Sequence, residues 1–277
     1  MAIDLVTKFK EQVDEQFTEQ SKSELFTNND YDFTGANTIK IYSVKTSSMN
    51  DYDREGTGEE ISRYGEIQGL DATIIEYKLE KDRSFTFAID KLDEDETQRV
   101  LQGATALARQ QREVIIPEVD TFTILRMSEK AGTIQKATEL TKDNIYQEIL
   151  KAQEVLDEKL IPETERTLIV STKVHNLLKL SGFLRDNTIA QDMLIKGVVG
   201  VVDGLNVVKV SKGRLPGDFG FMIAHKSATV RPVKLEEFKI HENPPFISGS
   251  LVEGRVNYGA FVLENKKYGI YYQKANA

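Results

Sequence analysis

Residues 49–82 are the stretch that most restricts how this chain can fold. The segment holds ten acidic and four basic side chains, and its apolar residues are scattered. Strand-like runs flank it at 38–42 and 84–89. Within it, residues 72–80 alternate between a largely charged face and a second face, and that alternation is typical of a β-strand. The residues of the second face are Thr73, Ile75, Tyr77 and Leu79.

This pattern predicts a β-hairpin whose tip lies near residues 56–65. Each limb would reach roughly 50 Å at about 3.3 Å per residue. A compact globule of this chain length is itself only about 50 Å across. Because a two-stranded hairpin is marginally stable alone in water, we expect it to lie on a neighbouring copy of the chain. The sequence therefore indicates a subunit of an assembly.

Composition is that of an ordinary globular protein, with 40% apolar and 29% charged residues. There is no run of about 18 uncharged apolar residues, so we expect no membrane span. The N-terminus lacks the features of a secretion signal. The chain has no cysteine, which excludes disulfides and thiolate chemistry and suits synthesis in the cytosol.

The net charge of −8 is unevenly distributed. Residues 1–165 carry 20 basic and 35 acidic side chains, whereas residues 166–277 carry 16 basic and nine acidic ones. Either the two halves touch within one subunit, or acidic parts of one copy rest on basic parts of the next, which would fix their register. No basic patch dominates, so sequence-specific nucleic-acid recognition is not expected.

Hydrophobic periodicity predicts an α+β fold, because strands and helices mix without strict alternation. The long second helix should end or kink before Pro117. Helix 143–160 should turn Ile145, Ile149, Leu156 and Leu160 inward. The expected helices are 3–20, about 95–115, 143–160 and 174–180, the last stopped at Gly182. The expected strands are 168–170, 198–202 and 206–210 with Gly204 in the turn between them, and strand-rich stretches at 219–224, 228–240 and 256–272.

No motif argues for catalysis, a cofactor or a metal. The three histidines, His175, His225 and His241, are far apart and have no partner at metal-ligand spacing. The glycines at 56 and 58 lack the lysine of a phosphate-binding loop. The triplet 218–220 matches one from protein kinases, but their other motifs are missing. We therefore expect a protein that is not an enzyme.

The order of segments resembles the major capsid (head) protein of a tailed bacteriophage, with the Hong Kong ninety-seven type of fold. The hairpin is followed by KDRSFTFAIDKLDEDET and by the helical stretch QRVLQGATALARQQREVIIPEVD. ERTLIVSTKVHNLLK, GVVGVVDGLNVVKVS and KSATVRPVKLEEFKI come next, and VNYGAFVLENKKYGIYY closes the chain. The resemblance covers nearly the whole chain, and the junction at 81–97 is its most specific part.

This resemblance implies a domain organisation. It consists of an N-terminal arm (1–48), an extended β-hairpin loop (49–82), a peripheral domain with a long spine helix (83–130 and 227–262) and an axial domain (131–226 and 263–277). Some relatives cross-link their shells through an extended-loop lysine, but residues 49–77 contain none. The chain also starts almost directly at the arm, so a scaffolding segment would be either processed away or a separate protein.

The resemblance also implies a function. The chain would be the structural subunit of an icosahedral phage head, self-assembling as hexamers and pentamers around double-stranded DNA that it encloses without sequence-specific binding. Scaffolding protein and portal would be partners, and the virion, assembled in the cytoplasm of the bacterial host, would be its location. One alternative is an encapsulin-like protein compartment of the same fold. A hydrolase or transferase with a divergent site is another.

Acidic residues of the loop are expected to pair with basic residues of a neighbouring copy. The contact residues expected on the loop are Asp53, Arg54, Glu55, Glu59, Glu60 and Arg63. Those expected on the neighbour are Arg109, Arg112, Arg231 and Lys234.

Overall fold

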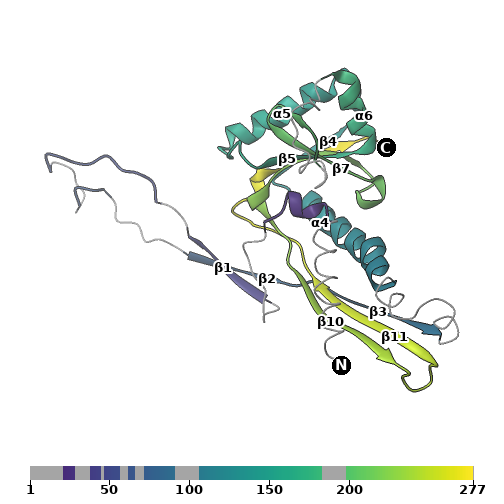
Figure 1. Ribbon diagram of the computed structural model, residues 1–277. Coiled ribbons are helices and arrows are strands. Elements are labelled where there is room, and N and C mark those ends of the chain that lie inside the picture. Colours follow the sequence, from purple (N-terminus) through teal and green to yellow (C-terminus); the bar gives the residue numbers. More distant parts are fainter. Residues whose placement is uncertain are drawn as a thin grey trace. The chain divides into compact units, whose positions relative to one another are not determined.

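The computed structural model describes residues 21–28, 38–44, 47–56, 62–65, 72–90, 106–182 and 198–276. The chain divides into two units, Gly35–Lys78 and the remainder, which are described one at a time (Figure 1). The helix expected at 3–20 and the beginning of the one expected at 95–115 lie outside the described residues.

Unit Gly35–Lys78 is built on one antiparallel pair, β1 (Thr38–Val44) and β2 (Ala72–Lys78). In every pair of opposed residues the two numbers add to 116, from Thr38 with Lys78 to Val44 with Ala72. Farther out, the backbone N of Asp53 donates to the carbonyl of Arg63 at 2.9 Å, and these numbers have the same sum. The two limbs are therefore antiparallel at 38–44 and 72–78 and are joined again at Asp53 and Arg63, which confirms the expected hairpin.

The strands of this unit lie at the inner end of the hairpin. The unit begins at Gly35 and ends at Lys78, and β1 pairs with β2 within it. Alternation along β2 is as expected, because Ile75 and Tyr77 are half-buried and Ile74, Glu76 and Lys78 are exposed.

In the remainder of the chain a mixed six-stranded sheet carries most of the core. The order is β4 (Thr133–Thr138), β13 (Ile270–Ala275), β8 (Phe219–His225), β5 (Arg166–Ser171), β7 (Leu205–Val210) and β6 (Val198–Val202). β4 runs parallel to β13, and β5 runs parallel to β7, while the other neighbours are antiparallel.

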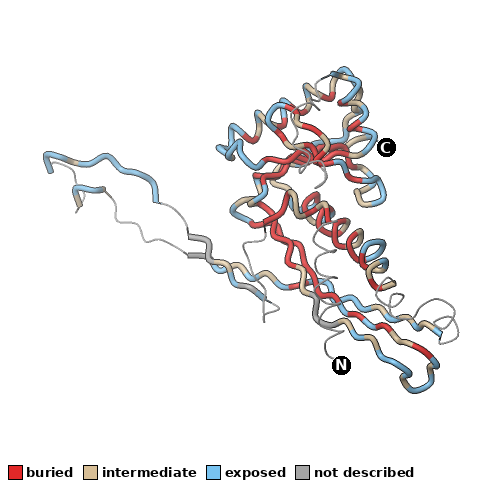
Figure 2. The backbone as a smooth tube through the Cα atoms, in the orientation of Figure 1, coloured by how far each residue is buried: buried red, intermediate tan, exposed pale blue. Residues whose placement is uncertain are grey.

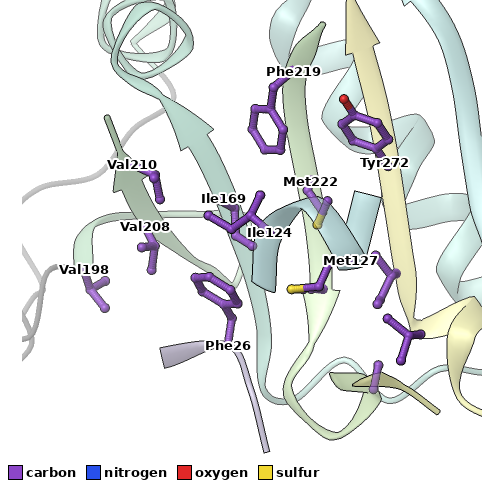
Figure 3. Packing of buried hydrophobic residues seen from close by; sticks show 14 residues of the cluster. Phe26, Ile124, Met127, Ile169, Val198, Val208, Val210, Phe219, Met222 and Tyr272 are labelled. Carbon is purple, nitrogen blue, oxygen red and sulfur yellow. The ribbon is translucent and has the colours of Figure 1, made fainter. Parts of the chain in front are cut away.

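Both faces of this sheet are covered, which explains the continuous apolar run of β5. Leu168 and Val170 pack with α5 (Ile145–Glu158) and α6 (Thr172–Ser181). Ile169, between them, points to the opposite face and packs with Ile124, Met127 and Phe26 (Figure 3). Alternating residues of a strand face opposite sides, so a strand buried on both sides loses its polar face.

The long helix differs from its expected form at Pro117. Residues 106–110 are helical, Gln111–Ile115 form a π-helix (η2), and α4 then runs from Ile116 to Lys130. The sequence predicts that the helix ends or kinks before Pro117; it does not end there, but a π-helical turn interrupts its regular α-helical pattern just before the proline. Proline cannot donate a backbone hydrogen bond, and its ring crowds the preceding helical turn. The wider π-helical turn just before Pro117 accommodates the missing bond and the ring. The helix therefore continues for 15 residues as α4.

A second sheet of three antiparallel strands packs against this helix. Its order is β10 (Val233–Glu242), β11 (Gly249–Tyr258) and β3 (Lys81–Asp90). Ile115, Val119 and Phe122 of the helix meet Val256 and Tyr258 of β11, and the buried residues of α4 and of the β10–β11 pair can be followed in Figure 2.

Short elements complete the described part of the chain. Strands β9 (Thr229–Val230) and β12 (Phe261–Val262) pair with each other. The remaining short helices are η1 (Ser23–Leu25), η3 (Lys212–Arg214), η4 (Lys226–Ala228) and η5 (Lys267–Gly269).

Two turns confirm the sequence analysis. Helix α6 ends at Gly182, whose φ of +77° is the left-handed conformation that glycine adopts without penalty. Strands β6 and β7 are joined by Asp203 and Gly204, which both have positive φ, as a two-residue hairpin turn requires.

One predicted core residue is wrong. Leu160 does not face inward but is 89% exposed. It lies just past the end of α5, where its N donates to the carbonyl of Asp157 at 2.8 Å and the N of Ile161 donates to that of Leu156 at 3.1 Å. These bonds turn the chain at the helix end, and Ile161 packs against the core instead.

Candidate assembly surfaces

The outer part of the hairpin is organised by Asp53. Its Oδ1 accepts from the backbone N of Glu55 at 3.1 Å and of Gly56 at 2.8 Å. Gly56 has a φ of +70°, and the guanidinium of Arg63 lies 3.1 Å from where a Cβ on that glycine would stand. The Asp53 carboxylate therefore shapes the turn in addition to carrying charge.

Of the other loop residues expected to contact a neighbouring copy, three are described by the structure and two are not. Arg54, Glu55 and Arg63 are exposed at this end of the hairpin, so their charges face outward. Glu59 and Glu60 lie outside the described residues.

Two tyrosines stand across the hairpin from each other. The ring centroids of Tyr52 and Tyr64 are 5.0 Å apart in an edge-to-face arrangement, and the side chains are 53% and 78% exposed. Sequence reasoning missed this pair, although their numbers also add to 116 and the register alone places them opposite each other.

Arg109 and Arg112 are exposed on the long helix. Arg109 Nε lies 4.0 Å from Glu113 Oε1, and Arg112 Nη2 lies 3.9 Å from the same oxygen. One carboxylate thus stands between two guanidiniums, and the group keeps an excess positive charge. Lys234 is half-buried on β10.

Arg231 is buried within its own subunit, which the sequence did not indicate. Its side chain is almost completely buried, Nη1 donates to Ser21 Oγ at 2.8 Å and Nη2 donates to Glu24 Oε1 at 2.9 Å. Burial lowers the pKa of this guanidinium below its ordinary value, and burial raises the pKa of Glu24. Arg231 therefore joins Ser21 and Glu24 to the rest of its own subunit.

Asp120, fully buried on α4, completes this attachment. Its carboxylate accepts from Ser21 Oγ at 2.9 Å, Ser23 Oγ at 2.6 Å and Arg214 Nη1 at 3.0 Å. The backbone N of Lys22 donates to the same carboxylate at 3.2 Å. The only sequence signal for this cluster is an acidic residue on the same helix face as the apolar residues Ile116, Ile124 and Met127.

The described residues offer no assembled metal site. Among them, no group of three or more His, Asp or Glu side chains could hold a metal ion. His241 Nε2 is 3.3 Å from Glu253 Oε2 on the neighbouring strand, while His175 and His225 are buried. Of the helices in the described ranges, none has the length and apolar character needed to cross a membrane.

These elements, a hairpin unit, a long helix on a three-stranded sheet and a six-stranded mixed domain, define the class. The chain has the major capsid protein fold of tailed bacteriophages, the Hong Kong ninety-seven type, and the expected fold class is confirmed.

Similar solved structures include the capsid of the cyanophage P-SCSP1u (TM-score 0.67, 14% identity, 92% of this chain and 87% of that one). A structure of Mycobacterium phage Che8 matches with a TM-score of 0.65 at 18% identity, over 92% and 90% of the two chains. The virus-like particle from Pyrococcus furiosus matches with a TM-score of 0.57 at 10% identity, over 97% and 98%. No protein-family model and no curated protein matches the sequence.

Proposed function

We propose that this chain is the structural subunit of an icosahedral phage head and that many copies close into a shell around double-stranded DNA. The observation that carries the proposal is the hairpin unit Gly35–Lys78. Where burial is described in that unit, every residue is exposed or half-buried. A two-stranded hairpin of this kind has no core of its own to offset the entropy of ordering it. A neighbouring copy supplies the missing surface.

The tyrosine pair lies at the centre of the proposed contact between the hairpin and the neighbouring copy. Tyrosine is enriched among the residues that dominate binding energy at interfaces, and Tyr52 and Tyr64 present adjoining, exposed rings. Charges surround them, with Arg54, Glu55 and Arg63 at the same end. Apolar anchors inside a charged rim are the usual arrangement of a specific interface.

Arg109 and Arg112 are the best-supported partners for the acidic loop residues. Both guanidiniums are exposed, and the single carboxylate of Glu113 leaves their group with net positive charge. Arg231 is a weaker candidate, because its guanidinium already bonds Ser21 and Glu24 of its own subunit.

Net charge agrees with a DNA-enclosing role. Binding of cationic surfaces to DNA is driven by counterion release, and a strongly basic lining would hold DNA in place as it is packaged. A subunit with a net charge of −8 avoids this. Scaffolding protein and portal, as partners in the bacterial host, complete the proposal by resemblance.

A shell that encloses protein cargo is the second candidate. It is kept because the same fold also occurs in a virus-like particle from Pyrococcus furiosus, and that match covers 97% of this chain and 98% of that one. The contents of particles purified from the native source discriminate: nuclease-protected double-stranded DNA supports the phage head, and protein cargo without DNA supports the compartment.

The role of the hairpin can be tested by shortening it in register. Replacing residues 44–72 with Asn-Gly keeps the paired residues Ser43 and Thr73 opposed and supplies a favoured two-residue turn between them. We expect a folded subunit that forms no closed shells in negative-stain images, whereas the unmodified chain does. Normal shells from the shortened chain would contradict the role given to the hairpin.

A further inference from the structure

The loop between β10 and β11 displays a phenylalanine in an unfavourable backbone conformation. Phe246 has a φ of +72° and exposes 106% of its reference surface. Left-handed backbone suits glycine and is tolerated by asparagine, such as Asn243 in the same loop with a φ of +48°. A bulky side chain there is an outlier, and such strain is concentrated at functional sites.

The loop holds this ring in a defined position. Pro244 and Pro245 precede it, and proline fixes its own φ. The backbone N of Asn243 donates to the carbonyl of Gly249 at 2.7 Å, and the N of Ile247 donates to that of Pro244 at 3.2 Å. Phe246 therefore points away from its own subunit on a restrained turn.

We infer that Phe246 is an anchor that packs into an apolar surface on a second copy of this chain. The inference rests on the proposed shell function and adds a contact remote in sequence from the hairpin unit. The run 244–247 is apolar and uncharged, and polar residues border it at Glu242, Asn243 and Ser248. An apolar centre inside a polar border is how residues that dominate an interface are placed.

Size and charge favour a second copy over an unrelated partner. One aromatic side chain buries about 150–250 Å², whereas a specific interface of two proteins needs about 1,600 Å². Such a small contact is effective where other contacts already hold the molecules together, as they do between copies in a shell. Copies with a charge of −8 repel one another, and a neutral contact adds no further repulsion.

Leu160 provides a matched control. It is also apolar, exposed and left-handed, with a φ of +56°. Its conformation, however, follows from the hydrogen bonds that end α5, so it needs no partner to explain it.

The test compares F246N and F246G with L160N. Asparagine and glycine accept positive φ, so the first two variants remove the ring and relieve the strain together. We expect the thermal midpoint of the unassembled subunit to stay equal or rise, while the protein concentration needed for particle formation increases at least about tenfold. L160N should leave that concentration unchanged. A lowered midpoint in both F246N and F246G would contradict the strain argument, and unchanged assembly would overturn the anchor.

Labelling identifies the partner. Because the chain has no cysteine, a trace of F246C mixed with excess unmodified chain carries a single reactive thiol. We expect maleimide labelling to slow at least about tenfold on assembly, with L160C unaffected. Equal labelling before and after assembly would mean that no second copy covers this position. If the unmodified chain forms no particles, the proposed shell function is wrong as well. If particles form normally and residue 246 stays accessible to maleimide, only the anchor role of Phe246 is wrong.

Discussion

At the scale of single residues, the buried carboxylate of Asp120 is the most consequential group. It gathers two serine hydroxyls and the guanidinium of Arg214, and thereby fixes residues 21–28 to α4. Hydrophobic periodicity predicts the helix but not the role of Asp120, because hydrogen-bond partners about one hundred residues away leave no periodic signal in the sequence. Phe246 was missed for a related reason, since backbone conformation in a loop is set by the surrounding hydrogen bonds.

Removing this carboxylate should be costly. D120A leaves Arg214 and two hydroxyls without their partner in a buried site, and losing one member of a buried ion pair costs about 3–5 kcal/mol. We expect the free energy of unfolding to fall by about 3 kcal/mol in urea titrations. E129A, which breaks an exposed pair with Arg126, should change it by less than about 1 kcal/mol. Similar small losses in both variants would be inconsistent with this account.

The exposed tyrosine pair should behave in the opposite way. Y52S combined with Y64S removes apolar surface that the subunit does not bury, so its unfolding transition should be unchanged. Assembly should require at least about tenfold more protein, as expected for residues that dominate an interface. Sedimentation velocity over a concentration series measures this, and assembly at the original concentration would exclude the pair as an anchor.

At the scale of elements, period-two alternation was enough to predict the hairpin, and short apolar runs predicted several strands of the six-stranded sheet. The sequence pattern could not predict the π-helical turn before Pro117, because a proline indicates that the regular helix is disturbed but not how the backbone accommodates it. It also could not reveal why Gly254 is glycine: a Cβ there would lie 2.3 Å from the Phe85 ring and 2.8 Å from that of Phe238.

Gly254 therefore marks a close approach inside the three-stranded sheet. We expect G254A to lower the free energy of unfolding by about 1–3 kcal/mol, the usual cost of overpacking. Gly213 is the control, because nothing lies within 4 Å of its added Cβ and G213A should be nearly neutral. Equal urea midpoints for the two variants would refute the packing of Phe85 and Phe238 against this glycine.

The register of the hairpin can be tested chemically. Tyr52 and Tyr64 lie beside the backbone hydrogen bond from Asp53 to Arg63, and their ring centroids are 5.0 Å apart, so we expect cysteines at these two positions to come close enough for a disulfide. Oxidised Y52C/Y64C should form the bond readily within one chain, whereas Y52C/S62C, shifted by two residues, should not. Faster bonding in the shifted pair would disprove the assigned register.

At the scale of the whole molecule, the resemblance carried by the order of segments predicted the fold correctly, although no curated protein matches the sequence. The domain boundaries and the charged inter-subunit contacts remain predictions, since a contact between copies depends on a surface that one chain does not contain. Electrostatic pairing between copies predicts weaker assembly as salt rises from about 0.1 M to about 1 M, where the screening length falls from about 10 Å to about 3 Å. Static light scattering that shows no salt effect would exclude charge pairing as a major contribution.

The most direct test of the central claim is electron cryomicroscopy of the concentrated, purified chain. The account predicts closed shells of many copies in which residues 47–65 lie on a neighbouring subunit. A chain that stays monomeric, or a shell in which these residues contact only their own subunit, would contradict it.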